Sequence, residues 1–541
     1  MKWKIRRALF SLSDRSGVQE LAKTLHDLGC EIIATGGTGR DLEAAGLPVT
    51  GISEITGNPE AFGGRMKTIS FQFESSLLFD RERDADEAAS LGIEAIDMVV
   101  CNLYPFAEHR AKGSDTATLV ENIDIGGPTM LRAAAKNYRY VAVVCDPADY
   151  GPIVEELRSE AGSLSMETRA RLMRKAFNHT ADYDAMIAET LDERAGRPSL
   201  RLSFPKGRSL KSGENDQQKG WVFDACTGPS LASAEQLGGK PVGYNNFIDF
   251  LGALEAVRDL PRQGCAVIKH TNPCGLCDAD EQRRAADLAW AGDPVSAFGS
   301  VVAFNRTLTL RAAQFLQLED PDPAKRKFVV GVAAPEFEAD ALEYLRQKAA
   351  LRILRFDPEW VRPDREYRYL PNACLVQERD ATLYDELNVV TDTGPEGELS
   401  EGSPFRRLFD FGQIAVRQVK SNAIVVVGST DDGSIRVLGM GAGQPNRVVS
   451  TGLAIDRARA TLSTEASSTE DVESFVRDGL SRAVLVSEAF FPFPDSVEVA
   501  SAAGIRTIVQ PGGSIRDDLV IARCNELGVS MITTGTRHFK H

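Results

Sequence analysis

The sequence predicts an α/β protein with at least two domains, the first of them built on a parallel sheet. Apolar runs of strand length alternate with stretches of helical periodicity, which is the pattern of helices that cover parallel strands. The chain has 541 residues, of which 43% are hydrophobic and 26% are charged, so it exceeds the size at which one hydrophobic core keeps growing. We therefore expect separate cores in separate domains.

The first expected domain covers residues 1–197. Residues 7–46 alternate strand, turn and helix twice, and further buried strands are expected at 96–103 and 140–145, on either side of a helical stretch. The segment 193–220 is polar and broken by glycine and proline, which is typical of a boundary.

The second expected domain covers residues 198–541. Short apolar strands such as CAVIKH, SVVAFN and AVLVS alternate in it with helical stretches, which predicts a larger α/β unit. Residues 388–404 within it are expected to form an exposed loop or a boundary between subdomains.

Charge and composition narrow the classes of ligand. A net charge of -15 argues against a broad nucleic-acid or anionic-membrane surface, but is compatible with a local basic pocket for a small phosphate. The N-terminus lacks the apolar stretch of a signal peptide, and no segment approaches the roughly 18 apolar residues of a membrane span. The nine scattered cysteines are typical of reduced, buried thiols. We expect a cytoplasmic protein that binds small molecules.

Two glycine-containing turns, Ser13–Gly17 and Thr35–Thr38, follow the first two expected strands and lead into helices. Helix N-termini offer unpaired N–H groups and partial positive charge, so the two turns together predict a phosphate cradle. Turn glycines with capping hydroxyls would explain the same pattern without a ligand. Neither turn fits a Walker loop or the dinucleotide fingerprint.

Three further segments give the first domain a distinctive sequence pattern: GGRMKT (63–68), CNLYPF (101–106) and NIDIGGPTMLRAAAKN (122–137). A single Lys, Tyr or Asp in such places is usually a solvated residue, but the three segments together resemble the signature of the IMP cyclohydrolase domain. That domain belongs to a bifunctional purine-biosynthesis family, which formylates aminoimidazole carboxamide ribonucleotide (AICAR) and then closes the ring to inosine monophosphate (IMP). The resemblance implies a fold like methylglyoxal synthase, with the nucleotide phosphate on the two turns.

The resemblance also implies roles for individual residues in ring closure. Lys67 would polarise the carboxamide oxygen, an Asp124–Lys136 pair would hold and move the proton, and Tyr104 would assist. Backbone N–H groups of Gly126 and Gly127 would form the oxyanion site. Because the two reacting groups belong to one molecule, near-attack geometry supplies much of the rate and no covalent nucleophile is needed. The other implied binding residues are Ser13, Arg15, Ser16, Gly17, Thr35, Gly37, Thr38, Arg65, Thr68 and Asn102.

One segment of the first domain departs from the family. After GGRMKT the family continues with a segment of the type LHPxxHGG, whereas this chain has ISFQFESSLLFDRERD (69–84). Part of the substrate-facing wall is therefore expected to differ.

The second domain contains the string CAVIKHTNPCGLC (265–277). Lys269 and His270 end an apolar strand, where ligands of open α/β sheets bind, although such a pair is often structural. The P-C-x-x-C segment raises the alternative of a zinc deaminase, which also needs an H-x-E motif. None of the six histidines begins H-x-E and the chain has no second C-x-x-C, so a zinc site lacks ligands, and a thioredoxin-type pair would lie in the wrong surroundings. We expect no catalytic metal.

IKHTNPCG resembles the KHxNPCG motif of AICAR transformylase. Other transformylase-like segments accompany it across the second domain: GYNNFID, GDPVSAFGSVVAFN, KSNAIVVV, GMGAGQPNRV, EAFFPFPDSV, QPGGSIRD and the terminal TGTRHFKH. The resemblance implies two cytidine-deaminase-like α/β subdomains without zinc. It also implies 10-formyltetrahydrofolate as cosubstrate.

In the implied transfer, His270 is the general base that deprotonates the amine of AICAR, a role typically worth about 10²- to 10⁴-fold in rate. Lys269 would stabilise the oxyanion or protonate the departing folate nitrogen, and Asn422 would orient the amine or the formyl group. A capped terminus and core aromatics would explain several of the remaining residues equally well. The implied binding residues are Lys211, Phe298, Gly299, Arg447, Phe490, Asp495, Arg537, Phe539 and His541.

The segment around Lys211 also departs from the family, which has LRYGENPHQ where this chain has LKSGENDQQ (210–218). Lys211 keeps the charge of an arginine without its bidentate geometry, and Ser212 lacks an aromatic ring.

Three functions compete at this point. The first is the bifunctional enzyme, with AICAR, formyl-AICAR, IMP and reduced folate as ligands and with no nucleic-acid or membrane partner. The second is a transformylase whose degenerate first domain only binds nucleotide, and the third is a noncatalytic nucleotide-binding protein. The resemblance further implies a homodimer whose transformylase sites lie at the subunit interface.

Overall fold

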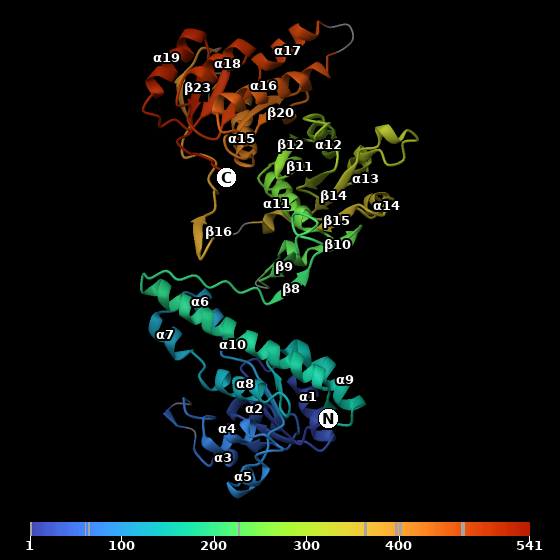
Figure 1. Ribbon diagram of the computed structural model, residues 1–541, viewed down its shortest axis with the longest axis vertical. Coiled ribbons are helices and arrows are strands. Elements are labelled where there is room, and N and C mark those ends of the chain that lie inside the picture. The colour runs from blue at the N-terminus through green and yellow to red at the C-terminus, as the bar shows by residue number, and fades with distance from the viewer. Residues whose placement is uncertain are drawn as a thin grey trace. The chain divides into compact units, whose positions relative to one another are not determined.

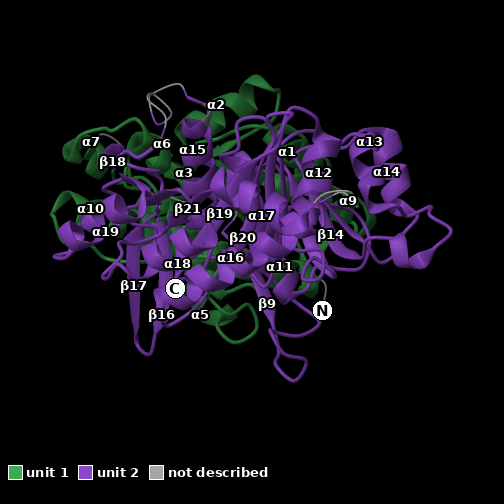
Figure 2. Cartoon of the chain, turned by 90° about the horizontal axis from the view of Figure 1, so that it is seen from above, with its two compact units in different colours: residues 1–203 green, residues 204–541 purple. Residues whose placement is uncertain are grey.

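The structure is a computed structural model that describes residues 3–541 apart from 60, 63–64, 226–227, 362–364, 395–398, 400–402 and 467–470. The chain forms two compact units, residues 1–203 and 204–541, which are coloured separately in Figure 2. Each unit has its own sheet and its own buried core (Figure 1). No described helix combines the length and the apolar character that a membrane crossing requires.

Unit 1 is built on a five-stranded parallel sheet in the order β4-β3-β2-β5-β6. The strands form where the sequence has short apolar runs, and the side chains of Ala8, Leu9 and Phe10 are completely buried. Its strands are β2 (Arg7–Ser11), β3 (Glu31–Ala34), β4 (Thr50–Gly51), β5 (Met98–Cys101) and β6 (Ala142–Val144), with a small antiparallel pair of β1 (Trp3–Lys4) and β7 (Ser163–Leu164).

Ten helices in the described part of unit 1 connect and cover these strands. The longest, α10, has 29 residues, begins with the capping hydroxyl of Ser165, and packs against α8 and β6. The helices are α1 (Val18–Asp27), α2 (Gly36–Ala44), α3 (Ile52–Thr56), α4 (Phe71–Leu78), α5 (Ala85–Ser90), α6 (Phe106–Ala111), α7 (Thr116–Glu121), α8 (Gly126–Lys136), α9 (Tyr150–Ser159) and α10 (Met166–Arg194).

Unit 2 is built on a twelve-stranded mixed sheet in the order β10-β15-β14-β13-β11-β12-β20-β19-β21-β22-β23-β18. The strands are β10 (Glu235–Gly238), β11 (Gln263–Lys269), β12 (Asn272–Ala279), β13 (Ser300–Phe304), β14 (Val329–Ala334), β15 (Arg352–Arg355), β18 (Asn388–Thr391), β19 (Ile424–Ser429), β20 (Ile435–Gly441), β21 (Val484–Ser487), β22 (Thr507–Gln510) and β23 (Ser530–Thr533). The helices that pack on the sheet are α11 (Tyr244–Arg258), α12 (Gln282–Ala291), α13 (Leu310–Ala313), α14 (Ala339–Arg346), α15 (Pro404–Arg417), α16 (Arg447–Ser463), α17 (Val472–Ser481), α18 (Asp495–Ala503) and α19 (Asp517–Leu527). Two hairpins stand outside the sheet: β8 (Lys206–Ser209) with β9 (Trp221–Asp224), and β16 (Arg365–Leu370) with β17 (Ala373–Glu378).

The large sheet consists of two halves with the same strand pairing. Each half has an antiparallel hairpin (β11–β12 or β19–β20), a third antiparallel strand, two further parallel strands and an antiparallel edge strand. In each half, a glycine of the hairpin lies against the helix that covers it. A Cβ on Gly275 would lie 1.6 Å from the carbonyl oxygen of Ala289 in α12, and a Cβ on Gly439 would lie 2.2 Å from the carbonyl oxygen of Ala454 in α16. The halves meet where β12 pairs antiparallel with β20.

The α/β class and the expected strands of both units are confirmed. The expected loop at 388–404 is wrong at its start, because Asn388–Thr391 forms β18 and pairs with β23 at the edge of the sheet. Its valines are β-branched, which suits a short edge strand despite the polar surroundings. Residues 395–398 and 400–402 of that segment lie outside the described residues.

Candidate functional site

The two glycine-containing turns of unit 1 lie side by side, since β2 and β3 are parallel neighbours and the turns follow their carboxyl ends. The Thr38 hydroxyl accepts a hydrogen bond from the Leu12 N–H over 3.0 Å, and the Thr35 hydroxyl donates to the Ser11 hydroxyl over 3.2 Å. Both threonine side chains are buried. They therefore shape the turns, and the backbone N–H groups at the start of α2 are what the second turn can offer to an anion.

Asn102 and Arg15 complete this cluster. Asn102 follows β5, and its Oδ1 accepts the N–H groups of Ser13 (2.7 Å) and Asp14 (3.0 Å), which fixes the first turn. The Arg15 guanidinium donates to Asp41 over 2.7 Å and lies so close to the second turn that a Cβ on Gly37 would be 2.7 Å from its Nη2. Ser16 and Gly17 end the first turn, and the φ of Gly17 is 70°. The structure thus brings these phosphate candidates together.

Asp124 is the centre of a second cluster in unit 1. Its carboxylate accepts the backbone N–H of Gly127 over 2.8 Å and that of Tyr104. Burial raises the pKa of the Asp124 carboxyl, although these two N–H groups lower it. The Thr68 hydroxyl lies 2.7 Å from the position of a Cβ on Gly126. Asp124 therefore occupies the Gly127 N–H, and the oxyanion site at Gly126 and Gly127 stays a prediction.

Tyr183 of α10 is a contact of Asp124 that the sequence did not reveal. The Asp124 N–H donates to the Tyr183 hydroxyl over 2.9 Å, and the Tyr183 ring packs edge-on against Phe106 with centroids 6.4 Å apart. A buried tyrosine on an amphipathic helix reads as a core aromatic, so no sequence signal separated it from its neighbours.

Lys136 does not join this cluster. It ends α8, whereas Asp124 precedes the start of that helix, and at 1.5 Å of rise per residue the two backbones are about 15 Å apart or more. The predicted Asp124–Lys136 pair is therefore wrong.

Arg65 is exposed and forms an ion pair with Glu121, with its Nε 3.3 Å from Oε1. Lys67 is half-buried beside Thr68.

In unit 2, the His270–Thr271 dipeptide forms the two-residue turn between β11 and β12. Lys269 pairs with Asn272, and both turn residues have positive φ, 51° for His270 and 66° for Thr271. Lys269 donates from Nζ to the carbonyl oxygen of Phe298 over 2.8 Å. The Phe298 side chain is exposed and stacks at an angle on Phe328. Lys269, His270 and Phe298, together with the adjacent Gly299, therefore lie at one rim of the sheet.

Asn422, Arg447 and Glu488 form a polar cluster at the same rim. The Asn422 Oδ1 accepts from the Arg447 guanidinium over 2.7 Å, and its Nδ2 donates to the Gln444 carbonyl over 2.8 Å. Arg447 also donates to Glu488 over 2.7 Å, and Glu488 is completely buried. Burial raises the pKa of Glu488, while Arg447 lowers it. The Asn422 carbonyl is thus already engaged, and one N–H of its amide is the group left to orient a substrate.

Backbone contacts join the two rim clusters and the C-terminus. The Lys420 N–H approaches the Asn272 Oδ1 at 3.5 Å, and the Lys540 N–H donates to the Ser421 hydroxyl over 3.0 Å. Phe539 and His541 have ring centroids 5.6 Å apart, and the Arg537 guanidinium lies over the Phe539 ring. The predicted terminal residues therefore reach the segment that carries Asn422.

The three other predicted residues of unit 2 differ in placement. Phe490 is half-buried and follows Glu488 closely in sequence. Asp495 is exposed in the first turn of α18, where its carboxylate accepts the Ser496 N–H. Lys211 is exposed on a segment that the Asn245 amide ties to the start of α11 through the Glu214 carbonyl.

Comparison with known proteins covers both units. The model of the AICARFT/IMPCHase bienzyme family matches residues 134–457, and that of the MGS-like domain matches residues 17–129. The chain belongs to the AICARFT/IMPCHase bienzyme family. A relative from Persephonella marina, named bifunctional purine biosynthesis protein PurH, is 41% identical and covers 99% of this chain and 100% of its own length. Relatives of the same name from Ruminiclostridium cellulolyticum and Bacillus cytotoxicus are each 40% identical over the same shares of both chains.

One solved structure, titled "Crystal structure of ForH", is 36% identical and covers 36% of this chain and 100% of its own, with a TM-score of 0.32.

The cysteines that the structure describes in this chain are not arranged for metal or redox chemistry. Cys274 and Cys277 are buried, and burial raises the pKa of each thiol to about 12, so neither is a thiolate at neutral pH. Among the residues that the structure describes, no group of three or more His, Cys, Asp or Glu side chains could hold a metal ion.

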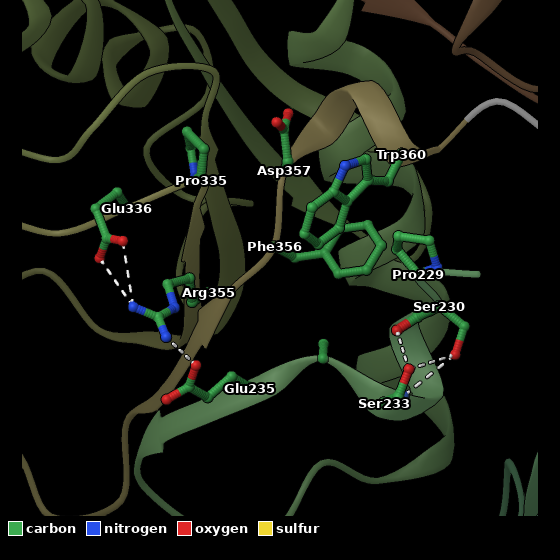
Figure 3. Close-up of a pocket in the computed structure, with 11 residues that line it drawn as sticks. Pro229, Ser230, Ser233, Glu235, Pro335, Glu336, Arg355, Phe356, Asp357 and Trp360 are labelled. Atoms are coloured by element: carbon green, nitrogen blue, oxygen red, sulfur yellow. Dashed lines mark hydrogen bonds and ion pairs between the residues drawn. The ribbon is translucent and has the colours of Figure 1, made fainter. Parts of the chain in front are cut away.

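A cavity of about 370 Å³ lies at the carboxyl ends of β14 and β15 (Figure 3). Arg355 is paired there with Glu235 and Glu336, and Phe356 packs edge-on against Trp360 at 5.3 Å. None of the residues predicted for catalysis or binding lines this cavity.

Proposed function

We propose that the chain is a bifunctional enzyme of purine biosynthesis. It transfers a formyl group from 10-formyltetrahydrofolate to AICAR and then cyclises formyl-AICAR to IMP with loss of water. The observation that carries this proposal is that one chain contains both clusters, Asp124 with Tyr104 in unit 1 and the His270 rim in unit 2. Family membership over nearly the whole chain supports both activities.

Formyl transfer takes place at the rim of unit 2. The AICAR amine forms a bond to the formyl carbon while His270 accepts its proton. The Lys269 ammonium, held by the Phe298 carbonyl, has further N–H groups for the developing oxyanion or for the folate nitrogen that leaves. The Phe539 ring suits a planar heterocycle, and Arg447 stays a proposed nucleotide contact although its guanidinium already binds Asn422 and Glu488. This chemistry uses no metal ion.

Ring closure takes place in unit 1, with the phosphate on the two turns near Arg15. The carboxamide nitrogen forms a bond to the formyl carbon and loses one proton. The formylamino nitrogen loses a second proton as it forms a double bond to that carbon, and the formyl oxygen takes up both protons and leaves as water. Asp124 is the proton acceptor that the buried cluster supplies, with Lys67 at the carboxamide oxygen and Tyr104 beside it. Lys136 lies at the other end of α8, so its proposed role does not depend on a direct pair with Asp124.

Full-chain turnover tests this proposal against the two rival functions. With AICAR and 10-formyltetrahydrofolate, the purified protein should release tetrahydrofolate and IMP in equal amounts. Accumulation of formyl-AICAR without IMP would establish the transformylase with a degenerate first domain. Binding of AICAR without any tetrahydrofolate would establish the noncatalytic protein.

We also propose that the enzyme is a cytoplasmic homodimer with no nucleic-acid or membrane partner, in keeping with its net charge of -15. The β16–β17 hairpin extends away from the sheet of unit 2 (Figure 1). It supports a dimer, because its side chains Tyr367, Tyr369 and Leu375 are exposed. A two-stranded hairpin is marginally stable alone in water, so it needs a surface to pack on. Arg368 donates to the His541 carbonyl over 2.7 Å, which connects this arm with the proposed transformylase site.

A further inference from the structure

The turn that carries His270 has a backbone conformation that its residues do not favour. Two-residue hairpin turns with positive φ at both positions are dominated by sequences such as Asn-Gly. Here φ is 51° at His270 and 66° at Thr271, and neither residue is glycine. A β-branched residue such as Thr271 is a particular outlier in this region, so the surrounding structure must hold the turn in place.

Asp249 makes the contacts that hold the His270–Thr271 turn. Its Oδ1 accepts the Thr271 N–H over 2.9 Å, and its carboxylate also accepts the His270 N–H. Two weaker constraints act within the turn itself, because the Thr271 hydroxyl and the Asn272 amide both donate to the His270 carbonyl, over 2.6 and 3.0 Å. Asp249 is the partner that lies outside the hairpin and engages both N–H groups.

The helix that carries Asp249 is a rigid support. Its neighbour Phe250 and the residues Ala253 and Leu254 of α11 are completely buried in the core of unit 2. Gly252, one helical turn after Asp249, faces the same hairpin turn, with its Cβ position 3.6 Å from the Thr271 carbonyl oxygen. The carboxylate is therefore fixed in space relative to the sheet.

We propose that Asp249 is a positioning residue for formyl transfer, whose carboxylate holds the left-handed turn that projects His270 from the rim of the sheet. The inference rests on the proposed role of His270. Without the carboxylate, the turn is free to adopt negative φ and the imidazole moves away from the amine.

The direct test is Asp249→Ala in the full chain. A displacement of about 1 Å at a reacting group costs on the order of 10²-fold, so kcat for formyl transfer should fall by about 10- to 100-fold while KM for AICAR changes little. Asp249→Asn keeps one acceptor oxygen and should show an intermediate loss. Cyclisation of supplied formyl-AICAR by the same preparations is the internal control and should not change.

A second substitution separates positioning from a merely stabilising role. Glycine adopts positive φ without a steric penalty, so Thr271→Gly added to Asp249→Ala should restore kcat at least severalfold over Asp249→Ala alone. A residue that only stabilises unit 2, or that accepts the proton itself, would not be rescued by a glycine in the turn. Wild-type kcat in Asp249→Ala, or a loss that the glycine leaves unchanged, would overturn the inference.

A structural measurement keeps the inference distinct from the proposed function. Crystals of Asp249→Ala should show negative φ at His270 or Thr271, and those of the double variant should show positive φ. If the wild type transfers no formyl group, or if His270→Ala transfers it at full rate, the proposed function fails while this readout still decides whether Asp249 holds the turn. An unchanged turn in Asp249→Ala would refute that role. Should Asp249→Ala not fold, Asp249→Asn takes its place.

Discussion

Arg447 and Glu488 form the most deeply buried charge pair of the proposed transformylase site. Glu488 has no exposed surface, and the Arg447 side chain is 9% exposed. Removing one member of a buried pair leaves the other charge without compensation, which typically costs about 3–5 kcal/mol. Arg447→Met should therefore lower the free energy of unfolding by that amount at neutral pH, measured by urea denaturation. Glu488→Gln in the same background should recover part of the loss, and no recovery would show that an uncompensated Glu488 charge does not cause it.

The same pair predicts a pH dependence. Burial places the folded-state pKa of Glu488 above its ordinary value. The contribution of this group to the free energy of unfolding is therefore fully present below its unfolded-state pKa. It is lost as the pH rises through the folded-state pKa. Arg447→Met removes the group that lowers this pKa. Its deficit in unfolding free energy should therefore be small below about pH 4 and should grow toward neutrality. A deficit that is constant with pH would contradict the ionised state of Glu488.

At the residue scale, the sequence indicates the proposed reacting groups better than the residues that support them. Lys269 and His270 were predictable because a charged pair after an apolar run marks the rim of a sheet. Asp249 and Glu488 were not, since the turn and the strand ends that they serve come from distant parts of the chain. The Asp124–Lys136 pair failed because the prediction ignored the length of the helix between them.

Helix α10 shows how one element supports a site in another part of its unit. It lies against α8 and presents the Tyr183 hydroxyl to the Asp124 N–H. A net hydrogen bond is worth about 0.5–1.5 kcal/mol, so Tyr183→Phe should slow cyclisation by about 2- to 10-fold and leave formyl transfer unchanged. Steady-state assays of both reactions on one preparation check this.

The control for that substitution is Tyr138→Phe, which makes the same chemical change in the same unit. It should leave both rates near those of the wild type. Equal losses of both activities in Tyr183→Phe would show that the substitution harms the whole protein instead of the Asp124 loop.

At the element scale, strands and helices follow from local patterns, but edge strands do not. The core strands appeared as continuous apolar runs, and the structure has them where they were expected. Asn388–Thr391 begins a polar segment, and its partner β23 lies more than a hundred residues later. Pairing with that strand, not local periodicity, makes it a strand.

At the scale of the whole molecule, unit 2 contains a structural duplication. The two halves of its large sheet share strand order and direction, although the sequence shows no short-period repeat. The register that joins β12 to β20 brings Asn272 toward Lys420 and so assembles the rim from both halves. Such long-range pairing depends on the fold and could not be predicted from either segment alone.

The dimer is the prediction that belongs to this scale. Tyr367 and Tyr369 share one exposed face of the β16–β17 hairpin. If this face packs on a second copy, Tyr367→Glu with Tyr369→Glu should convert the dimer to a monomer and reduce formyl transfer more than cyclisation. Sedimentation equilibrium measures the change, with Leu519→Glu on the exposed face of α19 as the control for added charge. A wild-type monomer, or a variant that stays dimeric, would contradict the role of the hairpin.

In the proposed function, two separate sites on one chain carry out formyl transfer and ring closure. The most direct measurement compares His270→Ala and Lys67→Ala in both reactions, with AICAR plus 10-formyltetrahydrofolate in one assay and supplied formyl-AICAR in the other. We predict that His270→Ala loses at least about 10²-fold in formyl transfer and keeps cyclisation, while Lys67→Ala shows the reverse. Loss of both activities in either correctly folded variant would contradict the separation of the sites.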